Sequence, residues 1–309
     1  RNAVSNFFMN GIFTVDVFFL MSGMSLSISY FAGGGRSAIE KLAIKRYLRL
    51  FIPIFASCFI VYLLYQAGLV FSNRAFEILN RHDWLGAWLH SPPDFLYVLR
   101  YSLADVFIFN DPPTAVIPFL WTMRIELIGS FLIFILLWGF ADSRYLRLWL
   151  LGFFILFAAI PNKSMNSLSC FIAGAGLADI AAHGGFKALQ KTYARYFVWG
   201  VFFAVGLSEV FFQFVSGGGK HIAAVLLLAA VFSNKTANDF FTNRASRFLG
   251  KISFSIYLVQ LPVIVSFSSW AVIYAHNHNM LNLATCLGIA TMTVVLSILG
   301  AVLFNPVEV

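Results

Sequence analysis

The chain has 309 residues, of which 60% are hydrophobic and only 11% are charged. Soluble domains carry roughly 25% charged residues, so this composition excludes an ordinary soluble protein and is typical of a polytopic membrane protein. The formal net charge is +8. We nevertheless exclude a nucleic-acid partner, because the basic residues fall in short segments between apolar runs.

The apolar runs are continuous rather than alternating, which favours helices over a β-barrel. We therefore predict an all-α fold, a polytopic transmembrane helical bundle of about nine spans that forms a single domain over residues 1–309. The predicted spans are 7–31, 50–70, 118–140, 147–161, 166–183, 196–215, 220–233, 252–274 and 281–304. The apolar segment 95–109 is short and contains Arg100 and Asp105, so we expect an interfacial or re-entrant helix there.

Most of the 21 basic residues lie in four predicted connecting segments: 32–49, 141–146, 184–195 and 234–251. An odd number of spans places all four on one side, and the positive-inside rule makes that side cytoplasmic and residue 1 external. The longest outer loop is then 71–117. The same alternation predicts at least one further span before residue 1 if the parent chain starts in the cytoplasm.

Asp16, Arg124 and Glu126 lie inside apolar runs, where a charge costs at least about 2.5–3.5 kcal/mol. At 1.5 Å per residue, Asp16 and Glu126 both lie about 12–14 Å from the outer ends of their spans, close to the bilayer midplane. They could line one cavity, or each could be a structural acid paired with a neighbour. Arg124 and Glu126 do not face each other along a helix, because they are two residues apart.

Arg46 and Arg49 are three residues apart and share one helix face where the basic segment 32–49 meets span 50–70. Two guanidinium groups in this position suit phosphate recognition, and they suit anchoring to lipid headgroups equally well. Tyr257 and Gln260 also share a face, beside Pro262, which can kink the helix and free backbone carbonyls. The alternative role for these polar groups is hydrogen bonding between helices.

The chain contains three cysteines, Cys58, Cys170 and Cys286, and all of them fall within apolar runs. We interpret them as small core residues rather than as a disulfide set or metal ligands. The neighbouring His276 and His278 are too few ligands for a metal site, so none is predicted.

Four blocks of the sequence combine these polar residues with glycines and aromatic residues. The blocks are Gly11-Ile-Phe-Thr-Val-Asp16-Val-Phe-Phe-Leu-Met-Ser22-Gly23, Lys45-Arg46-Tyr-Leu-Arg49-Leu-Phe-Ile-Pro53, Phe119-Leu-Trp121-Thr122-Met-Arg-Ile-Glu126 and Gly250-Lys-Ile-Ser253-Phe-Ser255-Ile-Tyr257-Leu258. In this order they resemble the motifs of membrane-bound acyltransferase family 3, whose members O-acylate bacterial polysaccharides, lipopolysaccharide and peptidoglycan.

The resemblance implies transfer of an acyl group, usually acetyl, from acyl-coenzyme A to a hydroxyl of a cell-surface glycan or glycolipid. It implies a multi-pass protein of the bacterial inner membrane, in contact with lipid, with acyl-coenzyme A as co-substrate and no permanently bound cofactor. The implied catalytic residues are Glu126 and Asp16, which would orient a histidine base or tune its pKa, and Arg46 and Arg49 would hold the coenzyme A phosphates. The implied supporting residues are Trp121, Thr122, Arg124, Ser253, Tyr257 and Gln260.

The chain departs from the family pattern in three places. At one of them Thr122 replaces the family's serine after Trp121 and keeps a hydroxyl. The family's first span, which carries an Arg and a presumed essential His, would precede Arg1, so we expect a fragment without its base to be inactive. The family's His after Tyr-Leu is replaced by Gln260. A transporter or flippase for a sugar or lipid-linked substrate is the alternative function, because transporters also contain midplane acids and broken helices. A scaffold or receptor subunit is a third interpretation.

Overall fold

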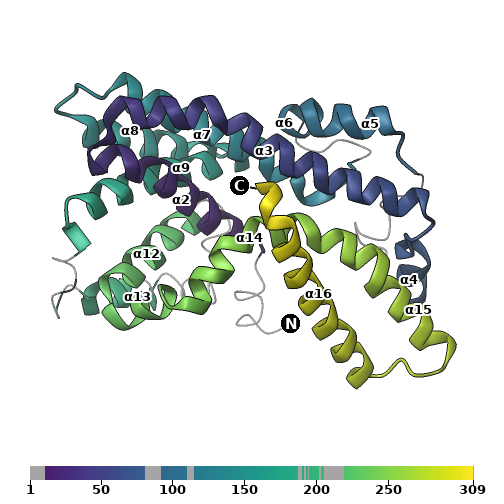
Figure 1. Ribbon diagram of the computed structural model, residues 1–309. Helices are drawn as coiled ribbons and strands as arrows, with labels where there is room; N and C mark the ends of the chain where they lie inside the picture. The colour runs from purple at the N-terminus through teal and green to yellow at the C-terminus, as the bar shows by residue number, and fades with distance from the viewer. Residues whose placement is uncertain are drawn as a thin grey trace. The chain divides into compact units, whose positions relative to one another are not determined.

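The structure is a computed structural model that describes residues 11–80, 92–109, 115–186, 190, 193, 195–201, 203–204 and 219–308. Every regular element in these ranges is a helix, which confirms the predicted all-α class (Figure 1). Long apolar helices satisfy their own backbone hydrogen bonds, and this is what a chain needs in a bilayer. The protein is therefore a helical membrane protein.

Within the described residues, five helical segments are long and apolar enough to cross a membrane. They are Phe13–Gln66, Pro118–Gly139, Lys163–Ala182, Arg244–Asn277 and Leu283–Val307, with two shorter apolar helices at Leu146–Ala159 and His221–Ser233. The predicted count of nine spans is not confirmed. Two of the predicted spans belong to the one 54-residue segment Phe13–Gln66, and most of the predicted span 196–215 falls outside the described residues.

The basic segment 32–49, predicted as a connecting loop, is helical almost throughout, and this prediction was wrong. A short π-helical turn, η1 (Tyr30–Gly34), joins α2 (Gly11–Ser29) to α3 (Gly35–Gln66). The chain bends at Gly33, whose φ of 101° a residue without a side chain adopts at little cost. Long basic side chains are compatible with a helix interior, so a cluster of them does not end a helix.

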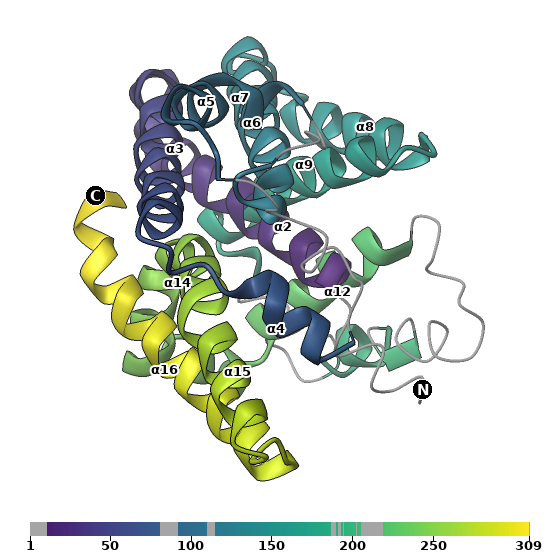
Figure 2. The same cartoon turned by 90° about the vertical axis from the view of Figure 1, so that its right-hand side faces the viewer.

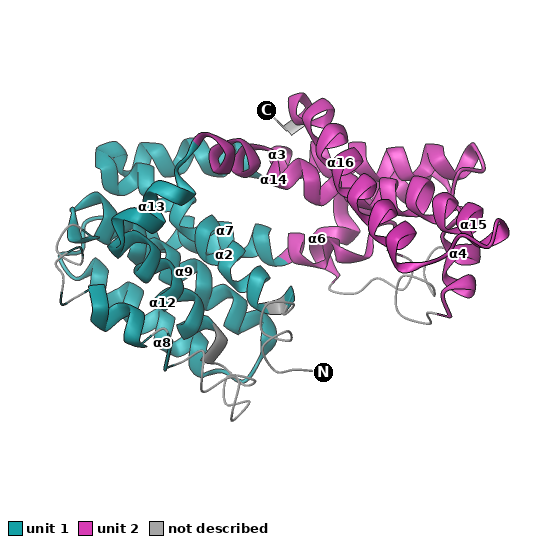
Figure 3. Ribbon diagram, turned by 90° about the horizontal axis from the view of Figure 1, so that it is seen from below, with its two compact units in different colours: residues 1–46, 125–243 teal, residues 47–124, 244–309 magenta. Residues whose placement is uncertain are grey.

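The chain forms two compact units, shown in different colours in Figure 3. Unit 1 comprises residues 1–46 and 125–243, and unit 2 comprises residues 47–124 and 244–309. Two of the three boundaries fall within α3 and α7 (Trp121–Gly139), and the third lies directly before α14 (Arg244–Val263). Each unit is compact, with helices that pack against one another within it. That the whole chain acts as a single domain stays a prediction.

Unit 1 is built around α2, which packs along α9 (Figure 1). Its other helices are the start of α3, most of α7, α8 (Leu146–Ala159), α9 (Lys163–Ala182), α12 (Gly219–Ser233) and α13 (Lys235–Phe241). A Cβ atom on Gly174 would lie 2.1 Å from the carbonyl oxygen of Leu20, and one on Gly23 would lie 2.2 Å from that of Phe171. Glycine at these two positions therefore permits the close approach of α2 and α9.

Unit 2 contains three helices that lie together near the C-terminus, α14 (Arg244–Val263), α15 (Ser269–Asn277) and α16 (Leu283–Glu308) (Figure 2). Its remaining elements are the rest of α3, α4 (Ser72–Ile78), α5 (Phe95–Arg100), η2 (Tyr101–Asp105), α6 (Val106–Ile108), η3 (Pro118–Leu120) and η5 (Ile264–Ser268). The segment 95–109 forms a short helix interrupted by the π-helical η2, which confirms the predicted helix; its interfacial or re-entrant placement stays a prediction. Two stretches of the predicted outer loop 71–117, residues 81–91 and 110–114, lie outside the described ranges.

Pro262 removes one backbone hydrogen bond from α14, but the chain stays helical beyond it in η5 and α15. Proline has no N–H to donate to the carbonyl four residues earlier, that of Leu258. The hydroxyl of Ser57 on α3 donates to this carbonyl at 2.8 Å. Beyond the proline, the hydroxyls of Ser266 and Ser269 donate to the carbonyls of Pro262 and Ile264 around the π-helical η5. The Leu258 carbonyl, which proline leaves without its usual helical donor, thus accepts a hydrogen bond from a side chain.

Candidate functional site

Glu126 on α7 forms a buried ion pair with Arg46 on α3 in unit 1. Arg46 Nη2 donates to Glu126 Oε1, and the carboxylate side chain is only 4% exposed. Arg46 Nε also donates to the hydroxyl of Ser130 at 2.8 Å, and that hydroxyl donates to the backbone carbonyl of Glu126 at 2.6 Å. Ser130 therefore holds both partners in one geometry, and the pair neutralises a carboxylate that water does not reach.

A residue of the first sequence block also lies at the Glu126 carboxylate. The side chain of Ser22 on α2, which belongs to the first block, lies beside Glu126. Blocks one, two and three of the sequence resemblance thus converge on Glu126 through Ser22, Arg46 and Glu126 itself. Local periodicity does not predict this convergence, because Arg46 and Glu126 are 80 residues apart.

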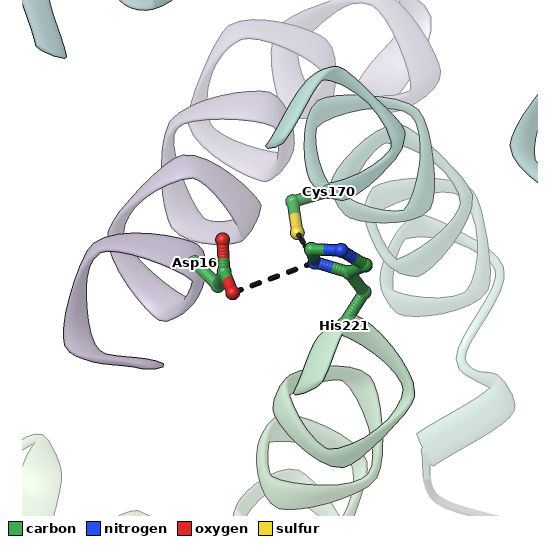
Figure 4. A group of neighbouring side chains, drawn as sticks. All are labelled: Asp16, Cys170 and His221. Carbon is green, nitrogen blue, oxygen red and sulfur yellow. Dashed lines mark hydrogen bonds and ion pairs between the residues drawn. The ribbon is translucent and has the colours of Figure 1, made fainter. Parts of the chain in front are cut away.

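Asp16 lies in a separate cluster of unit 1 with two residues that the sequence analysis did not select. His221 Nδ1 on α12 is 3.5 Å from Asp16 Oδ2 and 3.3 Å from the Sγ of Cys170 on α9 (Figure 4). All three side chains are buried. The sequence offered a weak signal for His221, which stands next to a glycine run at the start of an apolar segment.

Asp16 and Glu126 therefore have different partners within one unit. These contacts agree with the alternative in which each acid is paired with a neighbour. That the two carboxylates line a common cavity stays a prediction. The sequence analysis placed Arg46 with Arg49 at a phosphate site, whereas the structure commits the Arg46 guanidinium to Glu126 and leaves Arg49 exposed.

The fourth family block lies in unit 2. The hydroxyl of Tyr257 on α14 is 2.6 Å from that of Thr122, which is buried, and Tyr257 also donates to the carbonyl of Phe119. Here the third and fourth blocks meet, and the role of these residues in supporting the site stays a prediction. Ser253 is exposed and donates to the carbonyl of Gly250 in its own helix at 2.9 Å. The remaining predicted supporting residues are half-buried: Trp121, Arg124 and Gln260.

The contacts described above define a helical membrane protein with charged clusters inside its spans. Residues 2–302 match the family model of an acyltransferase domain. The chain therefore belongs to this family, acyltransferase family 3, and is a membrane acyltransferase. No curated protein and no solved structure matches the chain.

Proposed function

We propose that the protein transfers an acyl group, usually acetyl, from acyl-coenzyme A to a hydroxyl of a cell-surface glycan or glycolipid. In this reaction the hydroxyl oxygen forms a bond to the thioester carbonyl carbon, the carbon–sulfur bond breaks, and coenzyme A leaves as the thiol. The hydroxyl proton passes to a general base. We assign the protein to the bacterial inner membrane, with its basic segments on the cytoplasmic side.

The observation that carries this proposal is the convergence of three family blocks on the Glu126 carboxylate. A buried ion pair is a costly way to stabilise a membrane helix bundle, and apolar residues of similar volume are often at least as stable. A charged residue inside a membrane span is therefore a candidate for a functional role before a structural one. Arg46 donates to the Glu126 carboxylate, Ser22 lies beside it, and Ser130 links Arg46 to the backbone carbonyl of Glu126, so these residues fix the orientation of the carboxylate.

We assign Glu126 the role of positioning the group that takes the hydroxyl proton and of stabilising its positive charge. A correctly placed general base contributes typically 10²–10⁴-fold to the rate. Asp16 stays a second candidate for this role. Arg49 is exposed at the basic end of its span and is the residue we assign to the coenzyme A phosphates, because a guanidinium donates two parallel hydrogen bonds to a phosphate.

The test is acyl transfer by membranes that contain the intact protein, supplied with acetyl-coenzyme A labelled in the acetyl group. Glu126→Gln keeps the shape of the side chain and removes its charge, so incorporation of label into glycan should fall by about 100-fold or more. Glu40→Gln is the matched control, because Glu40 is an exposed acid of the same unit. Its incorporation should equal that of the unmodified protein.

Unchanged incorporation in Glu126→Gln, at equal amounts of protein in the membrane, would falsify the role of Glu126. Proton-coupled uptake of a sugar into vesicles, with no label covalently attached to glycan, would instead establish the transporter alternative. Binding of acyl-coenzyme A to the purified protein separates these two outcomes, because only the acyltransferase requires it.

A further inference from the structure

Three buried side chains with metal-ligating atoms come together from three different helices of unit 1. Asp16, Cys170 and His221 belong to α2, α9 and α12, which pack against one another. Their exposed fractions are 2%, 0% and 5%. One ligand atom from each residue lies within 4.8 Å of the others, and Figure 4 shows the three side chains pointing toward a common point.

Hydrogen bonding alone does not satisfy this cluster. Both the 3.3 Å contact to Cys170 Sγ and the 3.5 Å contact to Asp16 Oδ2 are made by the same atom, His221 Nδ1. An imidazole nitrogen carries either one proton or one lone pair, so Nδ1 can serve only one of the two neighbours well. Among the described residues, Asp16 Oδ2 is buried and has no hydrogen-bond partner.

The same geometry excludes a conventional catalytic triad. In a triad the carboxylate and the nucleophile bind opposite nitrogens of the imidazole, so that the ring relays a proton between them. In this cluster the carboxylate oxygen and the thiol sulfur approach the same nitrogen. Three groups aimed at one point, rather than arranged in a row, are what a bound cation requires.

We propose that Asp16, Cys170 and His221 form a binding site for one transition-metal ion, with Zn²⁺ as the best fit. Zinc binds Cys sulfur at about 2.3 Å and His nitrogen and carboxylate oxygen at about 2.0–2.2 Å, in a tetrahedral arrangement. Tetrahedral angles at these bond lengths place sulfur and nitrogen about 3.5 Å apart and nitrogen and oxygen about 3.4 Å apart. The separations in the structure are 3.3 Å and 3.5 Å.

The charge balance of the cluster supports the same assignment. A carboxylate, a thiolate and a neutral imidazole together carry two negative charges, which one divalent cation neutralises. A neutral cluster removes the penalty of an isolated carboxylate inside an apolar span. The mixture of sulfur, nitrogen and oxygen donors favours zinc over Mg²⁺ or Ca²⁺, which prefer oxygen ligands alone.

Three ligands from the described residues leave one position of a tetrahedral ion for water, for a substrate oxygen or for a donor outside the described ranges. Zinc sites with three protein ligands and such a position polarise a bound oxygen. The metal site does not rest on the proposed acyl transfer, because metal binding is measured without an acyl donor. Failure of either proposal leaves the other standing.

The experiment is titration of the intact, metal-stripped protein in detergent with Co²⁺, which reports thiolate coordination through a sulfur-to-cobalt charge-transfer absorption. We expect this absorption to saturate at one Co²⁺ per chain and to disappear when Zn²⁺ is added, but not when Mg²⁺ is added. Cys170→Ser should abolish it. Asp16→Asn and His221→Gln should each weaken Co²⁺ binding by more than about tenfold, because even residues behind metal ligands commonly contribute that much.

Cys58→Ser is the matched control, because Cys58 is equally buried but belongs to unit 2. It should keep the full charge-transfer absorption. The proposal is overturned if the unmodified protein shows no such absorption, or if the absorption persists in Cys170→Ser. The first result would leave Asp16 and His221 as a simple buried pair. The unmodified protein decides the first of these two outcomes, so that outcome does not depend on the folding of any variant.

Discussion

The two units stabilise polar atoms inside their long apolar helices in different ways. In unit 1 the contact is charged, because Glu126 binds Arg46 in an ion pair that is largely shielded from water. In the long helices of unit 2 the contacts are neutral: the hydroxyls of Thr122 and Tyr257 bind each other, and the hydroxyl of Ser57 donates to a carbonyl that Pro262 leaves free. Unit 2 also contains a buried acid, Asp105, but it lies in the short segment 95–109 and pairs with the mostly exposed Arg100.

The comparison suggests different roles for the two kinds of buried polar group: neutral hydrogen bonds join helices, and buried charges serve function. A neutral hydrogen bond between membrane helices contributes on average about 0.6 kcal/mol to stability, so losing one destabilises the protein only slightly. Burying a charge costs several kcal/mol of desolvation free energy per ion. Removing one partner of a buried pair lowers the stability of the protein by about 3–5 kcal/mol. A membrane protein keeps such charges where they act, which is why the proposed chemistry lies in unit 1.

The largest expected effect comes from breaking the charged pair of unit 1. Arg46→Met leaves Glu126 as an unpaired buried carboxylate and should lower the free energy of unfolding by about 3 kcal/mol. Unfolding in detergent, followed by denaturant titration, measures this loss. Combining Arg46→Met with Glu126→Leu removes both charges and should recover most of it, because a well-packed apolar pair is often as stable.

Arg36→Met provides the surface control for this comparison. Arg36 pairs with Asp142 at 2.8 Å, but the two side chains are 42% and 83% exposed. An exposed pair contributes about 0–1 kcal/mol, so the loss should be small. If Arg46→Met costs no more than Arg36→Met, then the charged pair does not distinguish unit 1 from unit 2.

An intermediate effect is expected at the α2–α9 contact in unit 1. Gly174→Ala places a Cβ atom against the backbone of α2 and should cost about 1–3 kcal/mol, because backbone atoms cannot move aside as a flexible side chain can. Gly176→Ala on the same helix is the control, since a Cβ atom there has no neighbour within 4 Å. It should be neutral or slightly stabilising. Thermal unfolding of both variants in one detergent compares them.

The smallest expected effect tests the neutral contacts of unit 2. Ser57→Ala removes the donor to the Leu258 carbonyl and should cost about 1 kcal/mol. Pro262→Ala restores a backbone N–H for that carbonyl, so Ser57→Ala should cost less when it is combined with Pro262→Ala. A double-mutant cycle of unfolding free energies measures this coupling. Strictly additive costs would show that the hydroxyl does not replace the hydrogen bond that proline lacks.

The sequence allowed good prediction of local features. Continuous apolar runs predicted helices in a membrane, and the polar residues inside them directed attention to Asp16 and Glu126, which are both buried. The connecting loop at 32–49 was predicted wrongly because a cluster of basic residues does not end a helix. A helix propagates wherever backbone hydrogen bonds and side-chain propensities allow it, and these residues allow it up to the bend at Gly33.

By itself, the sequence determined the class of protein, the all-helical fold and which acids lie in apolar surroundings, because these follow from composition and from the continuous apolar runs. Only the tertiary structure decided that Arg46 binds Glu126 and that His221 and Cys170 face Asp16. Contacts between helices depend on how glycines, large side chains and irregular turns orient whole helices against one another. No local pattern in one chain contains that information.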